Sequence, residues 1–376
     1  MLVNLRFYFS YFITNKVKEI ITQLFYNDKI VYFRSMNLLR KILFPFAILY
    51  GFITSIRNFL YDKGILKSYS FDIPIIAVGN LSVGGTGKTP QIEYLIRLLK
   101  PKFKVATLSR GYKRKSKGFI LADSNSNAEI LGDEPIQFYK KFNTIQVAVD
   151  VNRKNGIEQL LSQTNKPEVI LLDDAFQHRK VKAGFYILLT SYGDLYSDDF
   201  MLPTRNLREG RSGAKRANLV VVTKCPESLS IIEKNEIRTK LKLALNQELC
   251  FSFVDYDEFI YSEGKTMKVE EIRNIDKLLL AGIAKPMPFF AYLQSKNDKR
   301  LIFSDHHHFT ENDIREIKNK SQNKIIITTE KDFVRLKGKF TNKQLFYLPI
   351  RSSFLSASDN FDKAILNYVG TSTRNS

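Results

Sequence analysis

The sequence contains no tryptophan, only two cysteines and only four histidines among its 376 residues. Two cysteines, Cys225 and Cys250, cannot form a disulfide framework, and they lack the clustered Cys and His spacing of a zinc site. We therefore interpret both as ordinary packing residues of a cytosolic chain. A small-residue cleavage pattern of the kind that a secretory signal needs is also missing, so export is not expected.

A hydrophobic run long enough to cross a bilayer is missing from the N-terminal region. The apolar residues 42–56 would span only about 22 Å as a helix, whereas a bilayer core is about 30 Å thick. Pro45 and Gly51 weaken a spanning helix further, and basic residues surround the segment. This pattern favours an interfacial helix that lies in the headgroup layer. A buried helix packed on the main domain is the alternative, because apolar content alone does not separate the two.

Charge of one sign is in clear excess. Lys and Arg number 58 against 38 Asp and Glu, which gives a net charge of +20 and a pI near 9.6. Such a field favours a polyanionic partner, namely nucleic acid, an anionic membrane or phosphorylated substrates. With 44% hydrophobic residues the chain is long enough for two domains with buried cores, which excludes disorder as its dominant state.

Four regions are predicted along the chain. Residues 1–35 form an extension of open status, because translation starting at Met36 is one possibility. Residues 36–70 are expected to form a membrane-interface helix, residues 71–225 a first α/β domain and residues 226–376 a second, smaller one. From residue 71, short apolar runs alternate with helical periods, which predicts mainly parallel sheets. Strands are expected at 75–78, 105–109, 169–172, 186–190, 219–223, 278–281, 325–329 and 345–348, with a charged helical stretch at 227–245.

The strongest chemical signal is Gly-Asn-Leu-Ser-Val-Gly-Gly-Thr-Gly-Lys-Thr-Pro at residues 79–90. It follows an apolar run and precedes a segment with helical periodicity, which is the context of a phosphate loop. In such a loop Lys88 would reach the β- and γ-phosphates, and Thr89 would offer its hydroxyl to Mg²⁺. Ser82 departs from the usual signature, which has glycine there. The predicted nucleotide contacts are Ser82, Val83, Gly84, Gly85, Thr86, Gly87, Lys88 and Thr89.

Two adjacent carboxylates, Asp173 and Asp174, end the apolar run at 169–172. Like charges at a strand end repel each other unless a cation offsets them, so Mg²⁺ is the economical explanation. The alternative is that one of them caps the next turn. Gln177 and His178 follow at once, at the strand edge where ligands bind in open α/β sheets.

These residues resemble those of the tetraacyldisaccharide 4′-kinase family, which acts in lipid A assembly. The likeness runs from about Met36 to the end of the chain, and Ala175 departs from the family's usual glycine. The motifs that carry it are Leu-Phe-Pro at 43–45, Leu-Tyr-Gly at 49–51, the phosphate loop, Ser-Arg-Gly-Tyr at 109–112, Gly-Asp-Glu-Pro at 132–135, Leu-Asp-Asp-Ala-Phe-Gln-His-Arg at 172–179, Arg-Glu-Gly at 208–210, Ala-Gly-Ile-Ala-Lys-Pro at 281–286, Phe-Ser-Asp-His-His at 303–307 and Thr-Thr-Glu-Lys-Asp at 328–332.

The resemblance implies a role for each candidate residue. Asp133 would accept the proton of the acceptor hydroxyl, assisted by His306 from the second domain. Read alone, the triple His306–His308 is an exposed polar turn or an adventitious metal site. Glu209 would join Asp173 and Asp174 at the metal. The implied substrate contacts are Arg153, Gln177, His178 and Arg208, with Arg153 pairing with a phosphate.

The same resemblance implies the cofactors, the partners and the location. ATP with Mg²⁺ would phosphorylate the 4′-hydroxyl of an acylated glucosamine disaccharide 1-phosphate. The substrate stays in the bilayer, so the kinase would sit on the cytoplasmic face of the bacterial inner membrane, where residues 36–70 meet anionic lipids. The positive charge then needs no nucleic acid to explain it.

Two other classes remain as alternatives. A phosphate-loop GTPase or metallochaperone would bind nucleotide without a lipid acceptor. However, Thr223 and Pro226 replace the Asn and Asp of a guanine-reading Asn-Lys-x-Asp loop. A non-enzymatic basic protein would leave Lys88, Asp133 and Asp174 without a purpose.

Overall fold

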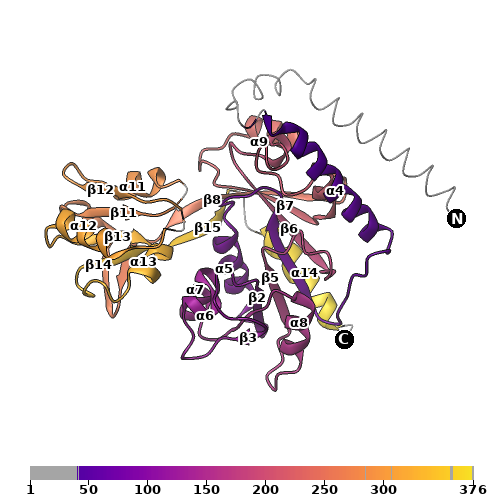
Figure 1. Ribbon diagram of the computed structural model, residues 1–376, viewed down its shortest axis with the longest axis horizontal. Coiled ribbons are helices and arrows are strands. Elements are labelled where there is room, and N and C mark those ends of the chain that lie inside the picture. Colours follow the sequence, from indigo (N-terminus) through magenta and orange to yellow (C-terminus); the bar gives the residue numbers. More distant parts are fainter. Residues whose placement is uncertain (1–39, 41, 284, 306, 356–358, 375–376) are drawn as a thin grey trace.

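The computed structural model describes residues 40, 42–283, 285–305, 307–355 and 359–374. Its described strands form a nine-stranded sheet, in the order β15-β8-β7-β6-β1-β5-β2-β4-β3, and a six-stranded sheet, in the order β10-β9-β14-β13-β11-β12. Each sheet is the centre of one lobe. Figure 1 shows the two lobes side by side, with β8 and β15 between them.

The first lobe is built on a sheet whose inner strands are parallel. These strands are buried on both faces, which explains their continuous apolar sequences. The strands of this sheet are β1 (Ile75–Asn80), β2 (Val105–Ser109), β3 (Ile120–Leu121), β4 (Gln146–Val149), β5 (Val169–Asp173), β6 (Phe185–Ser191), β7 (Leu219–Thr223), β8 (Glu248–Tyr256) and β15 (Ile350–Phe354).

Helices cover both faces of the first sheet. Successive β1 residues alternate between them: Ile76 and Val78 face one core, and Ile75 and Ala77 face the other. The first face is covered by α5 (Lys88–Leu99), α7 (Asp133–Lys141) and α14 (Asp359–Arg374), and the second by α8 (Arg153–Leu161) and α9 (Ile231–Leu241). The short helices α6 (Ala128–Leu131), η1 (Tyr196–Asp198) and η2 (Arg211–Arg216) complete this lobe.

The second lobe is smaller and has a parallel centre, with β11 between β12 and β13. Its strands are β9 (Phe259–Ser262), β10 (Lys265–Lys268), β11 (Leu278–Ala281), β12 (Lys299–Ile302), β13 (Ile326–Thr329) and β14 (Leu345–Leu348). Its helices are α10 (Val269–Arg273), α11 (Met287–Leu293), α12 (Glu311–Ser321) and α13 (Glu330–Leu336).

The eight strands predicted from the sequence all occur, with small differences at their ends. The predicted division at residue 225 does not coincide with the sheets, because β8, β15 and α14 return to the first one. Phe361, Ile365 and Val369 of α14 pack beside Val78 in the first lobe's core. Composition along the chain does not predict this arrangement, because β15 pairs with β8, a strand that lies about one hundred residues earlier in the sequence.

The helix α4 (Phe44–Asp62) contains the predicted interfacial segment and lies along the first lobe in Figure 1. Ala47 is its buried residue. Large apolar side chains of this segment remain more than half exposed, namely Ile42, Phe46, Leu49 and Ile53. None of the described helices combines the length and the apolar character that a membrane crossing requires. The predictions for residues 1–35 lie outside the described residues.

Candidate functional site

The phosphate loop joins β1 to α5, as the sequence predicts. Gly87 caps α5 with φ of 83°, a left-handed conformation that glycine adopts without strain. Lys88 opens the helix, and its Nζ lies 3.4 Å from Asn80 Oδ1 and 3.5 Å from Asp174 Oδ1. A helix N-terminus and a lysine therefore meet at the carboxyl edge of the sheet, which is an arrangement that attracts phosphate.

The two carboxylates lie beside this loop, because Asp173 of β5 is in register with Val78 of β1. Burial, reinforced by the charge of Asp174, raises the pKa of Asp173 to about 7. Its Oδ1 is buried and has no hydrogen-bond partner in the described part of the chain. Burial also acts on Asp174, but Lys88 and Arg208, whose Nη1 lies 3.1 Å away, lower its pKa below the usual value. The pair thus combines one ionised carboxylate, Asp174, with one whose ionisation is opposed by burial and by its neighbour's charge.

The donor set fits Mg²⁺, which prefers carboxylate and hydroxyl oxygens. Asp173 contributes an unpartnered buried oxygen, Asp174 lies next to it and Thr89 is the second residue of α5. Glu209 is not gathered with them. In the part of the chain that the structure describes, no three His, Cys, Asp or Glu side chains lie close enough together to hold a metal ion. Glu209 as an additional metal ligand therefore stays a prediction.

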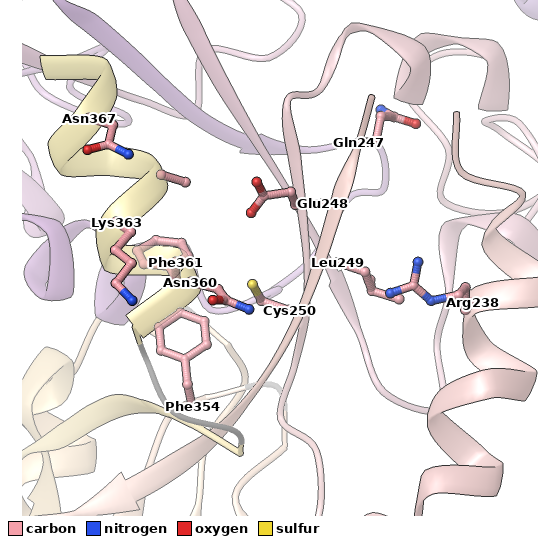
Figure 2. Close-up of a pocket in the computed structure, with 11 residues that line it drawn as sticks. Arg238, Gln247, Glu248, Leu249, Cys250, Phe354, Asn360, Phe361, Lys363 and Asn367 are labelled. Atoms are coloured by element: carbon pink, nitrogen blue, oxygen red, sulfur yellow. The ribbon is translucent and has the colours of Figure 1, made fainter. Parts of the chain in front are cut away.

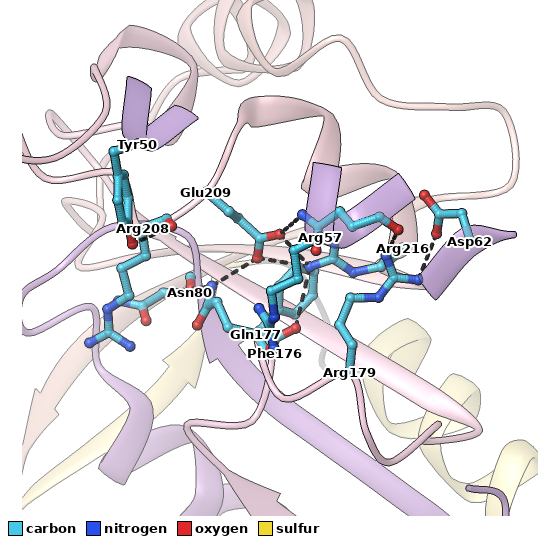
Figure 3. Close-up of polar contacts among 11 residues, drawn as sticks. Tyr50, Arg57, Asp62, Asn80, Phe176, Gln177, Arg179, Arg208, Glu209 and Arg216 are labelled. Atoms are coloured by element: carbon cyan, nitrogen blue, oxygen red, sulfur yellow. Dashed lines mark hydrogen bonds and ion pairs between the residues drawn. The ribbon is translucent and has the colours of Figure 1, made fainter. Parts of the chain in front are cut away.

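The carboxylate of Glu209 is instead the centre of a hydrogen-bonded network beneath α4 (Figure 3). It accepts bonds from Asn58 Nδ2 at 2.8 Å, Gln177 Nε2 at 3.0 Å and Arg216 Nη2 at 2.8 Å. Gln177 also donates to Asn80 O at 2.7 Å, so its amide is used inside the protein. Two predicted ligand contacts, Glu209 and Gln177, thus fasten α4 to the end of β1.

Further contacts hold α4 against the loops that follow β5 and β6. Tyr50 donates to Arg208 O at 3.0 Å, and Arg57 donates to Gln177 O at 3.2 Å. Arg179 donates to Asn58 O at 2.8 Å and lies 2.6 Å from Asp62 (Figure 3). The helix with the exposed apolar face is therefore rigidly joined to the predicted site.

Arg153, which is predicted to contact the substrate, is buried in the first lobe. It is only 2% exposed and donates to the backbone oxygens of Asp150 at 3.0 Å and Asp173 at 3.2 Å. Its guanidinium therefore links the carboxyl ends of β4 and β5. Burial and then the charge of Arg153 lower the pKa of His178 to about 4, so its ring is neutral at pH 7. Arg57, Lys180 and Arg110 are exposed cations whose charges also act on His178.

Asp133 is the first residue of α7 and follows Gly132, which has φ of 93°. Glu134, its neighbour, contributes to the raised pKa of Asp173, so the first turn of α7 lies near the carboxylate pair. Arg335 of α13, in the second lobe, forms an ion pair with Asp133. It also donates to His307 O at 3.4 Å. His306, the predicted partner of Asp133, lies outside the described residues.

A second ion-paired link joins the lobes at the other end of α7. Lys141 Nζ lies 2.7 Å from Glu93 of α5 and 2.9 Å from Glu330 of α13. Sequence reasoning missed this link and Arg335. About two hundred residues separate Arg335 from Asp133, so the sequence does not reveal that they form a pair. The one signal for Arg335 is its position three residues after the Thr-Thr-Glu-Lys-Asp motif.

A separate groove of about 530 Å³ lies between β8 and α14 (Figure 2). It is lined by the first residues of β8, which lie at the amino ends of the parallel strands, whereas the phosphate loop follows the carboxyl end of β1. Cys250 in its wall and Cys225 are both free. Burial raises the pKa of each thiol to about 12, so neither is a reactive thiolate at pH 7. The groove is therefore distinct from the phosphate site.

A strand, a glycine-rich loop with Lys88, and two carboxylates on the adjacent strand define a phosphate-loop nucleotide-binding protein. The family model described as tetraacyldisaccharide-1-P 4′-kinase (LpxK) matches residues 39–370. The chain belongs to this family. The predicted family, the α/β fold class and the kinase function are thereby confirmed.

Individual relatives agree with the family model. A tetraacyldisaccharide 4′-kinase of Flavobacterium johnsoniae is 69% identical over 334 residues, which cover 89% of this chain and 98% of the relative. One of Bacteroides thetaiotaomicron is 44% identical over 362 residues, with 90% and 95% covered. A crystal structure of LpxK from Aquifex aeolicus in complex with ATP superposes with a TM-score of 0.72 at 31% identity, over 88% of this chain and all of that one.

Proposed function

We propose that this chain transfers the γ-phosphoryl group of ATP to the 4′-hydroxyl of a tetraacyl disaccharide 1-phosphate, giving lipid IVA. The observation that carries the proposal is the meeting of Lys88 with Asp173 and Asp174 at one sheet edge, in a chain of this kinase family. Phosphoryl transfer depends on positioning and on charge neutralisation, and this edge offers both.

The loop and its lysine bind the nucleotide. The predicted contacts are Ser82, Val83, Gly84, Gly85, Thr86, Gly87, Lys88 and Thr89. Lys88 would exchange its contact with Asp174 for the β- and γ-phosphates, and Arg208 would remain on Asp174. Thr89, Asp173 and Asp174 would hold Mg²⁺, which neutralises charge on the transferred phosphoryl group.

Asp133 is the proposed proton acceptor. The 4′-oxygen forms a bond to the γ-phosphorus, the bond from that phosphorus to the β–γ bridging oxygen breaks, and ADP leaves. The hydroxyl proton passes to Asp133, with His306 as the assisting group. The ion pair with Arg335 fixes the direction of the Asp133 carboxylate, so we assign Arg335 as a positioning residue.

The acceptor's 1-phosphate needs an accessible cation. Arg153 is buried on backbone oxygens, whereas Arg110 is exposed and follows the end of β2. We therefore assign the 1-phosphate to Arg110, with His178 as a neutral neighbour that donates or accepts a hydrogen bond. Among the described residues, the buried Nε2 of His178 has no hydrogen-bond partner.

The helix α4 brings this site to the membrane. Its segment exposes Ile42, Phe46, Leu49 and Ile53 on one side, and Asn58 and Tyr50 join it to the site. Apolar side chains of this kind enter the interface between headgroups and acyl chains, and nearby basic residues attract anionic lipid. The protein would then lie on the cytoplasmic face of the inner membrane, where ATP is present.

The test is incubation of the purified chain with γ-labelled ATP, Mg²⁺ and acylated disaccharide 1-phosphate in detergent. Wild type should place the label on the 4′-oxygen. Lys88→Ala and Asp133→Ala should both lose transfer, and Asp133→Ala should still bind ATP. Label at another position, or a fully active Asp133→Ala, would overturn the proposed chemistry.

A further inference from the structure

The end of β7 lies against the phosphate loop. Thr223 Oγ1 lies 2.9 Å from Thr86 O and 3.2 Å from Thr190 O, so its one proton is shared between these carbonyls, and Lys224 Nζ donates to Gly85 O. These two residues occupy the place where a guanine-reading loop would have its Asn and Lys. Here their side chains contact the backbone of the phosphate loop.

The geometry of the peptide bond gives these contacts a consequence. A carbonyl and the N–H of the following residue belong to one rigid plane. Holding the carbonyls of Gly85 and Thr86 therefore also fixes the direction of two N–H groups: that of Thr86, which donates to Gly84 O at 3.0 Å within the loop, and that of Gly87. Phosphate loops bind their ligand through such N–H groups, so their orientation decides the affinity for phosphate.

The surroundings and the backbone conformation of Lys224 place its ammonium group against the phosphate loop. Burial, and next the positive charge of Lys285, lower the pKa of Lys224 from its usual value. Its backbone has φ of 58°, a left-handed conformation that costs a non-glycine residue free energy and persists only where its surroundings fix it. An added Cβ on Gly85 would lie 3.9 Å from Lys224 Nζ, so the ammonium group is seated directly against the loop.

We propose that Lys224 is a positioning residue that, together with Thr223, holds the phosphate loop in its binding conformation. This inference rests on the proposed binding of ATP at residues 82–89. Because Lys224 acts on the loop backbone, it supports binding of the diphosphate as well as the triphosphate. It has no direct effect on the acylated acceptor.

The experiment measures binding of ADP and of a non-hydrolysable ATP analogue with Mg²⁺, and the KM of the acceptor, in Lys224→Met and Lys224→Arg. Lys224→Met should weaken both nucleotides to a similar extent, by about tenfold, since a charge-assisted hydrogen bond is lost. Lys224→Arg should recover most of the affinity, and the acceptor's KM should not change. Lys240→Met, which removes an exposed charge of α9, is the matched control and should bind as wild type.

Thr223→Val against Thr223→Ser gives a second test that does not remove the lysine. Valine should weaken both nucleotides, and serine should restore them. Equal affinity of wild type and Lys224→Met for both nucleotides would overturn the inference while the proposed function stands. A loss for the triphosphate analogue alone would also overturn it, because that result indicates direct contact with the γ-phosphate. A wild-type chain that binds neither nucleotide would instead overturn the proposed function.

Discussion

Each lobe buries more than one aspartate side chain, and Asp298 and Asp173 differ in their partners. In the second lobe Asp298 lies 3.0 Å from the ammonium of Lys277, and both side chains are almost fully buried. Asp298 also accepts bonds from the backbone N–H and the hydroxyl of Ser295 at 2.6 and 2.9 Å. In the first lobe Asp173 has one oxygen without a partner and a second carboxylate, Asp174, as its neighbour.

The difference lies in whether the buried charge has a partner. A buried ion pair with all its hydrogen bonds made is stable by itself and needs no ligand. A buried carboxylate left without a partner costs folding free energy, which a bound cation would offset. Location agrees, because Asp173 lies beside the phosphate loop and Asp298 lies in the loop before β12.

The largest effects should come from replacing Lys88 in the first lobe and Lys277 in the second lobe by uncharged residues. Lys88→Ala should lower kcat at least about 10³-fold, because it removes charge stabilisation from the transferred phosphoryl group, and should change stability little. Lys277→Met should destabilise the protein by about 3–5 kcal/mol, because it leaves Asp298 buried and unpaired. Denaturant unfolding and kinetic assays of both variants measure this contrast, and a Lys88→Ala variant that loses stability but keeps its turnover would reverse it.

Arg335 tests whether the second lobe also serves the site in the first. Arg335→Ala should lower kcat by about 10²-fold with little change in the KM of ATP, because Asp133 loses its fixed orientation. Arg335→Lys should recover part of the rate. In an Asp133→Asn background the same substitution should have almost no further effect, since the two act as one unit. Independent, additive losses would mean that Arg335 acts elsewhere.

Exposed apolar side chains extend the comparison to the surface. Phe46→Ser should reduce partition onto anionic vesicles by about tenfold, because one large side chain is withdrawn from the lipid interface. Ile302→Ser on β12, which is similarly exposed at 59%, is the control in the second lobe and should leave partition unchanged. Sedimentation with vesicles gives both values. An equal reduction in vesicle partition for the two variants would show that α4 is not the membrane-binding segment.

The last prediction concerns how the free energy of unfolding depends on pH. The raised pKa of Asp173 means that the folded protein binds its proton more tightly than the unfolded chain does. Stability without nucleotide should therefore fall as the pH rises from about 4 to 7. Asp173→Asn has no such titration and should gain about 1–4 kcal/mol relative to wild type across this window. The matched Asp298→Asn should lower the free energy of unfolding over the same pH range. An Asp298→Asn variant more stable than wild type would contradict the difference between the two aspartates.

Local patterns in the sequence were sufficient for part of this account. The phosphate loop, Asp173 and Asp174 are close in space because adjacent parallel strands end at one edge, which alternation of strands and helices predicts. The pairing of Asp133 with Arg335 could not be predicted, since it depends on how two lobes meet. Glu209 and Gln177 have polar groups that suit ligands, and only the packing of α4 shows that Glu209 accepts hydrogen bonds from both Gln177 and Asn58.

The central claim is tested most directly by a crystal structure of the chain with Mg²⁺ and a non-hydrolysable ATP analogue. We predict the triphosphate within residues 82–89, the metal ion on Asp173 and Asp174, and the γ-phosphate facing Asp133. A triphosphate bound elsewhere on the molecule would contradict the account.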